Sequence, residues 1–143
     1  MVEADASAAD IAAYPDWAAA LAHGDADYNW KSWPVTTVAG YQILLFHITP
    51  KVAPAVPKGP VLLLHGMYSE PLDFLTRTDS TALATPLQLA AQGYDVWIGC
   101  TRGREITLGH ATLDTLDPIQ KAEYWNFTYE EVGRDDVDAL VNE

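Results

Sequence analysis

Two short runs of the sequence carry residues that could serve catalysis or ligand binding. The first, Val61 to Leu64, ends on His65-Gly66, and the second, Asp95 to Gly99, leads through Cys100 to Arg102-Gly103. Val61 to Leu64 has no polar alternation, which is typical of a parallel strand covered on both faces. Ligands bind at the carboxyl ends of the strands in an open α/β sheet. Both Gly-containing loops are therefore candidate positions for a site.

The chain has few candidate nucleophiles, and none has the expected surroundings. By residue type they are Ser7, Ser32, Ser69, Ser80 and Cys100. None of the serines stands in a Gly-x-Ser-x-Gly elbow, the strained turn that exposes a catalytic serine in α/β-hydrolases. Ser69 is near His65 but lies on a loop without glycines at the required spacing, and Cys100 follows a strand, where a buried cysteine is usually inert. We therefore expect no catalytic nucleophile in this sequence.

No metal site is predicted. The histidines lack a His-x-x-x-His spacing and the cysteine is single, so the pattern of a zinc site is missing. Asp25, Asp27 and Asn29 resemble the opening of a calcium loop. However, Trp30 stands where that loop needs glycine, and Thr36 where it needs glutamate. A solvated turn is the favoured interpretation.

The other polar signals are given structural roles. His23 and His47 lack any pattern of partner residues, and His110 is expected to anchor a loop. Asn126-Phe127-Thr128 matches a glycosylation sequon, but aromatic residues flank its asparagine and Thr128 is expected to cap a helix, so the site is expected to be packed and unused. Four aromatic residues are expected in the core rather than in a lipid-binding stripe: Tyr94, Trp97, Trp125 and Phe127.

Length and composition are those of one globular domain. The chain has 143 residues, 49% of them apolar, and a formal net charge of -12. Such a charge repels phosphate backbones, so nucleic acid is not an expected partner. No apolar run reaches the ~18 residues of a membrane span, and the single cysteine excludes an internal disulfide. The acidic start lacks a secretory signal, so the protein is expected either not to be secreted or to have lost a leader.

The local patterns predict a peripheral, Ala-rich arm at residues 1–27 and an α/β domain at residues 28–143. In the arm, Ser7 with Asp10 and Pro15-Asp16 are typical of two helix starts. The first elements predicted in the domain are a hairpin of Val35 to Thr37 and Tyr41 to Ile48 around Ala39-Gly40, an extended connector from Pro50 to Gly59, and the strand Val61 to Leu64. A loop from Met67 to Ser80, a helix from Leu83 to Gln92 stopped by Gly93, and the strand Asp95 to Gly99 are predicted to follow. The helix is expected to share one apolar face among Leu83, Leu87, Ala90 and Ala91.

The C-terminal segment carries a helix signal of its own. Thr128 and Glu131 form a capping-box pattern for a helix that runs to about Asn142. The residues expected on its inner edge are Tyr129, Val132, Asp136, Leu140 and Val141.

Several of these motifs, taken in series, resemble the N-terminal part of the acid lipase family, the lysosomal and gastric lipases and their relatives. The anchors are Val35-Thr36-Thr37, Gly40-Tyr41, Leu63-Leu64-His65-Gly66, Gly93-Tyr94-Asp95-Val96-Trp97, Gly99, Arg102-Gly103, His110, and Tyr124-Trp125 with Phe127-Thr128-Tyr129 and Glu131. The likeness spans about Tyr28 to Asn142. Three positions depart from the family's usual residues: Asp27, Ala39 and Cys100.

The resemblance implies the N-terminal half of an α/β-hydrolase sheet, a hairpin plus parallel strands with crossover helices. In that sheet the strand Val61 to Leu64 would lie between the strand Asp95 to Gly99 and the strand that carries the nucleophile, so the sheet would be incomplete without the nucleophile strand. It also implies that the backbone N–H of Met67, supported by His65 and Gly66, contributes to an oxyanion hole. The serine, aspartate and histidine of the triad would follow Glu143, so this chain is expected to be inactive by itself. The substrate implied is a lipid ester, with no metal or organic cofactor, and a lysosomal or secreted location follows from the resemblance alone.

Three interpretations of this pattern remain open. In the first, the chain is one segment of a lipase, and the remaining C-terminal segment, or another protein chain, pairs with the strand Val61 to Leu64. In the second, it is a non-catalytic, lipase-derived structural subunit of a larger assembly. In the third, it is an unrelated binding module. We favour the first, because an open apolar strand edge invites pairing.

Overall fold

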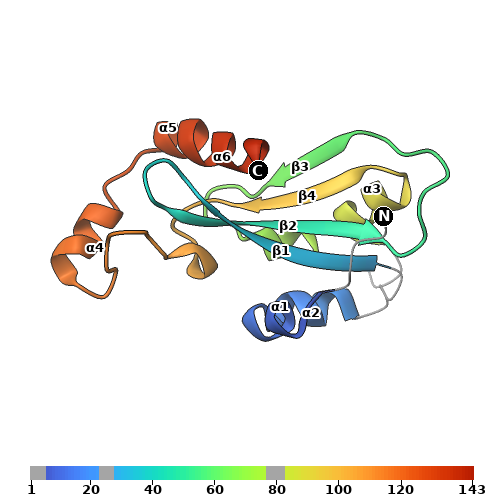
Figure 1. Ribbon diagram of the computed structural model, residues 1–143, viewed down its shortest axis with the longest axis horizontal. Coiled ribbons are helices and arrows are strands. Elements are labelled where there is room, and N and C mark those ends of the chain that lie inside the picture. The colour runs from blue at the N-terminus through green and yellow to red at the C-terminus, as the bar shows by residue number, and fades with distance from the viewer. Residues whose placement is uncertain (1–5, 23–27, 77–82) are drawn as a thin grey trace. The chain divides into compact units, whose positions relative to one another are not determined.

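The structure is a computed structural model that describes residues 6–22, 28–76 and 83–143. Its strands form one four-stranded sheet in the order β1-β2-β4-β3 (Figure 1). The bounds are β1 Tyr28–Thr36, β2 Gln42–Pro50, β3 Pro60–Leu64 and β4 Asp95–Cys100. Because β3 and β4 point the same way and β2 points the opposite way, the sheet is mixed. The fold class is α/β, as predicted.

Short helices accompany the sheet. They are α1 Ala8–Ala13, α2 Pro15–Ala22, η1 Pro71–Phe74, α3 Thr85–Ala91, η2 Glu105–Thr107, α4 Pro118–Tyr124, α5 Tyr129–Glu131, η3 Val132–Asp136 and α6 Val137–Asn142. Within the described ranges, no helix has both the length and the apolar character needed to cross a membrane.

The chain divides into two compact units, and each is described by itself. Unit 1 consists of residues 1–32 and 46–98, and unit 2 of residues 33–45 and 99–143. Strand β3 belongs to unit 1, whereas β1, β2 and β4 each pass from one unit into the other.

An aromatic cluster forms part of the core of unit 1. Trp17 of α2 stacks on Phe46 of β2, with ring centroids 3.8 Å apart and planes 9° apart. Tyr14 meets the same ring edge-on at 5.2 Å, and Trp17 and Leu21 are buried. The predicted helix start at Pro15 is confirmed. However, the expectation of a merely peripheral arm is wrong, because the apolar face of α2 packs into the core.

Helix α1 begins with the predicted capping box. The Ser7 hydroxyl accepts from the Asp10 amide at 3.1 Å, and the Asp10 carboxylate accepts from the Ser7 amide at 3.0 Å. The same carboxylate accepts a bond from the Ser32 hydroxyl and another from the Ser32 amide at 3.2 Å. Asp10 therefore both caps α1 and fastens it to β1.

Helix α3 and its stop lie close to the predicted positions. Gly93 has a φ of 95°, and a Cβ there would collide with the Val56 carbonyl, so glycine is required. Leu87 and Ala90 are fully buried, as expected for the inner face. Leu83 and Ala91 were expected beside them but are exposed, because Leu83 precedes the first turn and Ala91 ends the last.

Strand β3 differs from the prediction in its burial. Val61 to Leu64 are of intermediate exposure, not covered on both faces. The reason is that β3 stands last in the strand order, with β4 as its one neighbour in the described sheet. The predicted loop after it contains the short helix η1, and its residues 77–82 lie outside the described ranges.

In unit 2 the predicted hairpin turn and the predicted capping box at the start of the C-terminal helix are confirmed. The Thr37 amide donates to the Tyr41 carbonyl at 2.9 Å, and Gly40 has a φ of 92°. Thr128 N and Oγ1 donate to Glu131 Oε2 at 2.7 and 3.0 Å. Strand β1 begins at Tyr28, before the predicted Val35.

The predicted inner edge of the C-terminal helix is only partly right. Asp136 and Leu140 are buried, but Tyr129 is 61% and Val141 66% exposed. The segment contains the π-helix η3 between α5 and α6. Because a π turn bonds i to i+5, it rotates the residues on either side out of the regular helical phase.

Replacement of Trp17 tests the aromatic core. The Trp17→Ala variant is expected to lower the free energy of unfolding by about 3–5 kcal/mol, because it removes a buried ring and leaves a cavity. Urea unfolding followed by far-UV circular dichroism measures the change. Ile11→Ala on α1 is the control, since Ile11 is 48% exposed and its loss should cost less than about 1 kcal/mol. Equal costs for the two variants would contradict this account.

Candidate functional site

The loop that follows β3 presents exposed residues at the carboxyl end of the strand. A Cβ at Gly66 would meet no atom of the described residues within 4 Å. Met67 is 57% exposed and Tyr68 is 91% exposed. The Ser69 amide donates to the Gly66 carbonyl at 3.2 Å and closes the turn. Tyr68 has a φ of 61°, a left-handed conformation that costs a residue with a Cβ roughly 1–2 kcal/mol.

The Met67 amide is the donor group predicted from the sequence. No residue that the structure describes accepts a hydrogen bond from it. His65 Nδ1 lies 3.0 Å from the Gly66 carbonyl oxygen, and since a carbonyl only accepts, the Nδ1–H donates. An N–H without an internal partner on an exposed residue is available to an acceptor atom of a ligand. Its role in an oxyanion hole stays a prediction.

The next residues of the loop are held by one carboxylate. Asp73 Oδ2 accepts from the Ser69 hydroxyl at 2.5 Å and from the Glu70 amide at 2.9 Å. These bonds, the one from Ser69 first, lower the pKa of Asp73 below its usual 3.8. With its pKa lowered in this way, the Asp73 carboxylate is a weak base and would activate the Ser69 hydroxyl poorly, which agrees with the dismissal of Ser69 as a nucleophile.

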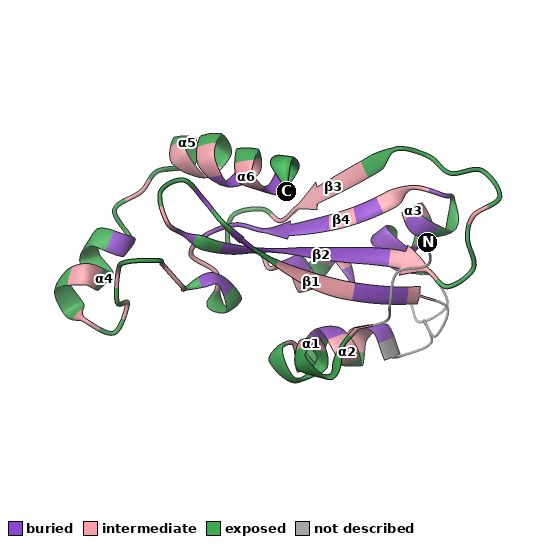
Figure 2. Ribbon diagram, viewed as in Figure 1, coloured by how far each residue is buried: buried purple, intermediate pink, exposed green. Residues whose placement is uncertain are grey.

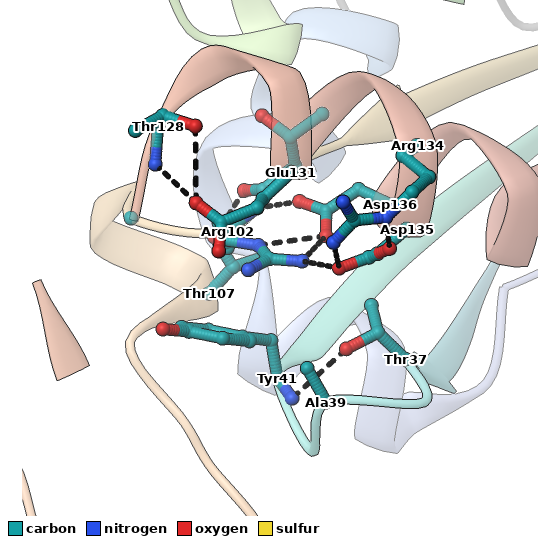
Figure 3. Close-up of polar contacts among 12 residues, drawn as sticks. Thr37, Ala39, Tyr41, Arg102, Thr107, Thr128, Glu131, Arg134, Asp135 and Asp136 are labelled. Atoms are coloured by element: carbon teal, nitrogen blue, oxygen red, sulfur yellow. Dashed lines mark hydrogen bonds and ion pairs between the residues drawn. The ribbon is translucent and has the colours of Figure 1, made fainter. Parts of the chain in front are cut away.

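In unit 2 a buried ion pair fastens the segment after β4 to the C-terminal helices (Figure 3). Arg102 Nε and Nη2 donate to Asp136 Oδ1 at 2.8 and 2.6 Å, and the Arg102 amide donates to Oδ2 at 2.8 Å. Arg102 is 3% and Asp136 0% exposed. Burial by itself lowers the pKa of Arg102, but the bond and charge of Asp136 raise it, and the net shift is upward.

The same guanidinium lies over an aromatic ring. Arg102 Cζ is 3.8 Å from the centroid of Tyr41, whose hydroxyl donates to the Tyr124 carbonyl at 2.7 Å. The Tyr124 hydroxyl in turn donates to the Thr107 carbonyl at 2.8 Å. Burial raises the pKa of both tyrosines. Since the polar groups of this cluster bond to one another, it is a structural anchor rather than an open binding site.

Sequence reasoning did not pair Arg102 with Asp136. The available signal was an aspartate on the expected inner edge of a helix together with an Arg-Gly pair after a buried strand. A buried carboxylate needs a cation or several donors, and Arg102 supplies both.

His110 and His47 also have structural partners. His110 anchors its loop as predicted: Nδ1 accepts from the Thr112 amide at 3.1 Å, so Nε2 donates to the Ala39 carbonyl at 2.9 Å. His47, for which the sequence shows no pattern of partner residues, has partners in the structure. His47 Nε2 lies 2.6 Å from Asp95 Oδ1, and its ring stacks on Trp97 with centroids 3.8 Å apart.

Cys100 and the sequon residues differ in exposure. Cys100 is 0% exposed, as expected of an inert thiol. Asn126, by contrast, is exposed and Trp125 is 44% exposed, so the expectation of a packed sequon and a core Trp125 is wrong. The reason is that these residues lie in the connection between two short helices, α4 and α5. Tyr94, Trp97 and Phe127 are of intermediate exposure.

Some predictions lie outside the described residues: those for His23, Asp25, Asp27 and Ser80. Asn29, the third residue of the calcium-like pattern, is buried. Within the described part of the chain, no group of three or more His, Cys, Asp or Glu side chains could hold a metal ion.

The known proteins that this chain resembles are lipases. The chain is 32% identical to Lipase 1 of Drosophila melanogaster over 76% of its own length and 22% of that lipase. It is 31% identical to Lipase member K of Homo sapiens over 80% of its length and 28% of the relative. It is 33% identical to human lysosomal acid lipase/cholesteryl ester hydrolase over 60% of its length and 20% of the relative. No family model matches the chain.

The fold and these similarities together indicate part of an α/β hydrolase of the lipase type. The fold is α/β and consistent with part of a hydrolase sheet. The chain contains a partial acid lipase region. It spans about a quarter of the length of the curated relatives it matches.

The Asp136→Asn variant tests the buried pair. It is expected to lower the free energy of unfolding by about 3–5 kcal/mol. The buried Arg102 loses its hydrogen-bonded counter-ion and keeps only Asp135, whose Oδ2 lies 3.7 Å from Nη2. Glu130→Gln, the same change at an exposed position of α5, should cost less than about 1 kcal/mol. Urea denaturation of both variants checks the difference. A cost for Asp136→Asn no larger than that of the control would show that the pair is not needed.

An acid titration tests the loop after β3. The folded pKa of Asp73 lies below the unfolded value of 3.8, so its bonds stabilise the loop above that value and are lost as the pH falls through the folded pKa. The NMR shift of the Glu70 amide should therefore titrate with a midpoint below 3.8. Ser69→Ala should move this midpoint upward, whereas Thr76→Ala, just beyond η1, should not. An unchanged midpoint in Ser69→Ala would contradict the assignment.

Proposed function

We propose that this chain is the N-terminal segment of a lipase or carboxylic ester hydrolase that acts on neutral lipid esters, and that it contributes the oxyanion loop but not the catalytic triad. The observation that carries the proposal is the Met67 amide, which has no acceptor among the described residues and belongs to an exposed residue at the carboxyl end of β3. The lipases among its relatives give the chemistry that such a donor would serve.

In the proposed reaction a serine from a segment beyond Glu143 attacks the acyl carbonyl of the ester. A histidine takes the serine proton and later gives it to the leaving alcohol. As the carbonyl oxygen gains negative charge, the Met67 N–H donates to it. One such donor lowers the barrier by roughly 2.7–4 kcal/mol. The open space beside Gly66 supports the proposal, because the substrate carbonyl must approach the backbone closely.

The sheet itself supports the same proposal. Strand β3 has a neighbour on one side only within the described sheet, and its apolar residues Val61 to Leu64 are half-exposed. We propose that the nucleophile strand of the remaining lipase segment pairs with this edge and covers these side chains. The lipase-like domain is proposed to begin at about residue 28, and Trp17 of the preceding helix α2 packs on it through Phe46.

The natural polypeptide decides between a lipase segment and a structural subunit. Intact mass and transcript sequence from the source cells should show that the chain continues past Glu143 into a Gly-x-Ser-x-Gly motif. A mature chain that ends at Glu143 and is isolated within a stable complex would instead favour the non-catalytic subunit.

Activity measurements test the role of Met67. Residues 1–143 alone should not hydrolyse p-nitrophenyl esters, whereas the longer polypeptide should. Replacing Met67 of the longer polypeptide by its α-hydroxy acid analogue changes only the N–H to oxygen, and kcat should fall roughly 10²–10³-fold. Met67→Leu is the matched control, since it keeps the amide. Equal kcat values for the two substitutions would refute the oxyanion role.

A further inference from the structure

The connection between α4 and α5 carries the one Asn-x-Ser/Thr sequon of the sequence, Asn126-Phe127-Thr128. Asn126 and Thr128 are exposed and Phe127 is of intermediate exposure. Figure 2 shows this connection in the colours of exposed and intermediate residues. A glycan needs such a position, because it is bulky and remains at the surface of the folded protein.

Contacts of the neighbouring aromatic residues and of its own backbone N–H hold Asn126 in place, and its side-chain carboxamide takes no part in them. A Cβ at Gly103 would lie 2.9 Å from Trp125 and 3.2 Å from Phe127, so both rings pack against Gly103. The rings stack on each other with centroids 5.9 Å apart. The Asn126 amide N–H donates to the Glu123 carbonyl at 3.0 Å, which makes a turn. No hydrogen bond of the Asn126 carboxamide is present within the described part of the chain.

The third sequon residue has a role in the folded chain that does not conflict with modification. The Thr128 hydroxyl donates to Glu131 Oε2 at 3.0 Å, beside the capping-box bond from the Thr128 amide at the start of α5. Modification of Asn126 would leave that bond intact, because the carboxamide is not part of the cap. The glycan would extend from the turn into solvent.

We propose that Asn126 is an N-glycosylation site of this protein when the chain is made in the secretory pathway. The donor is a lipid-diphosphate-linked oligosaccharide. Asn126 Nδ2 forms a bond to the anomeric carbon of the first sugar and loses one proton, while the bond from that carbon to the diphosphate oxygen breaks. The lipid diphosphate leaves with the bonding electrons, and no oxidant or reductant is needed.

Expression in secreting mammalian cells tests the site. The full chain is expressed with a cleavable N-terminal leader and a C-terminal tag that contains a separate acceptor sequon. Only molecules that are glycosylated on the tag are counted, because these have entered the secretory pathway. The wild-type chain is expected to carry two glycans and Asn126→Gln one, with peptide N-glycosidase F removing the difference. Thr128→Ser keeps both the sequon and the capping hydroxyl, and should still carry two.

A second measurement separates a surface site from an artefact of unfolded chains. The doubly glycosylated chain should unfold at a urea concentration no lower than the Asn126→Gln chain, because the sugar replaces no internal contact. The proposal would be overturned if the wild-type chain carried only one glycan. It would also be overturned if the glycan at Asn126 clearly lowered the urea midpoint of unfolding.

Discussion

The functional interpretation depends on the open side of β3. In the described sheet this strand has β4 as its one neighbour, so its other side presents backbone N–H and C=O groups between half-exposed Val61 and Leu64. Such an edge favours pairing with a further strand. Under the proposed function, the nucleophile strand of the remaining lipase segment pairs with this edge and covers its apolar side chains. The same strand brings the serine to the end of β3, where the Met67 amide lies.

The features predicted correctly from the sequence are those set by neighbours along the chain. The capping boxes at Ser7 and Thr128 need only a partner three residues away, and the stop at Gly93 needs only a residue that tolerates a positive φ. The apolar runs of β3 and β4 likewise define their own strands. The order of the strands did not follow from these local signals. It entered through the resemblance, and the position of β3 beside β4 agrees with it.

The features that sequence reasoning missed come from contacts distant in the chain or from irregular backbone. His47 meets Asp95 and Trp97 only because β2 and β4 are adjacent. Trp17 is buried because α2 packs on Phe46, and composition by itself made that segment resemble a free arm. The π turn at 132–136 shifted the helical phase, which no regular periodicity predicts. Of the candidate site, the loop position was predictable, but the Ser69–Asp73 bond and the strained φ of Tyr68 were not.

An oxyanion donor lowers a barrier only when it is fixed before the charge develops, because a mobile amide would have to reorganise during the reaction. The loop after β3 has the means to be fixed. The Gly66 carbonyl accepts from the Ser69 amide, and Asp73 holds the residues that follow. Tyr68 adopts its left-handed φ within this turn, and such strain persists only where surrounding contacts over-determine the backbone. Under the proposed function, the bonds of Asp73 to Ser69 and Glu70 would therefore do more than stabilise a surface loop: they would offset the strain at Tyr68 and help to keep the adjacent Met67 amide in one orientation.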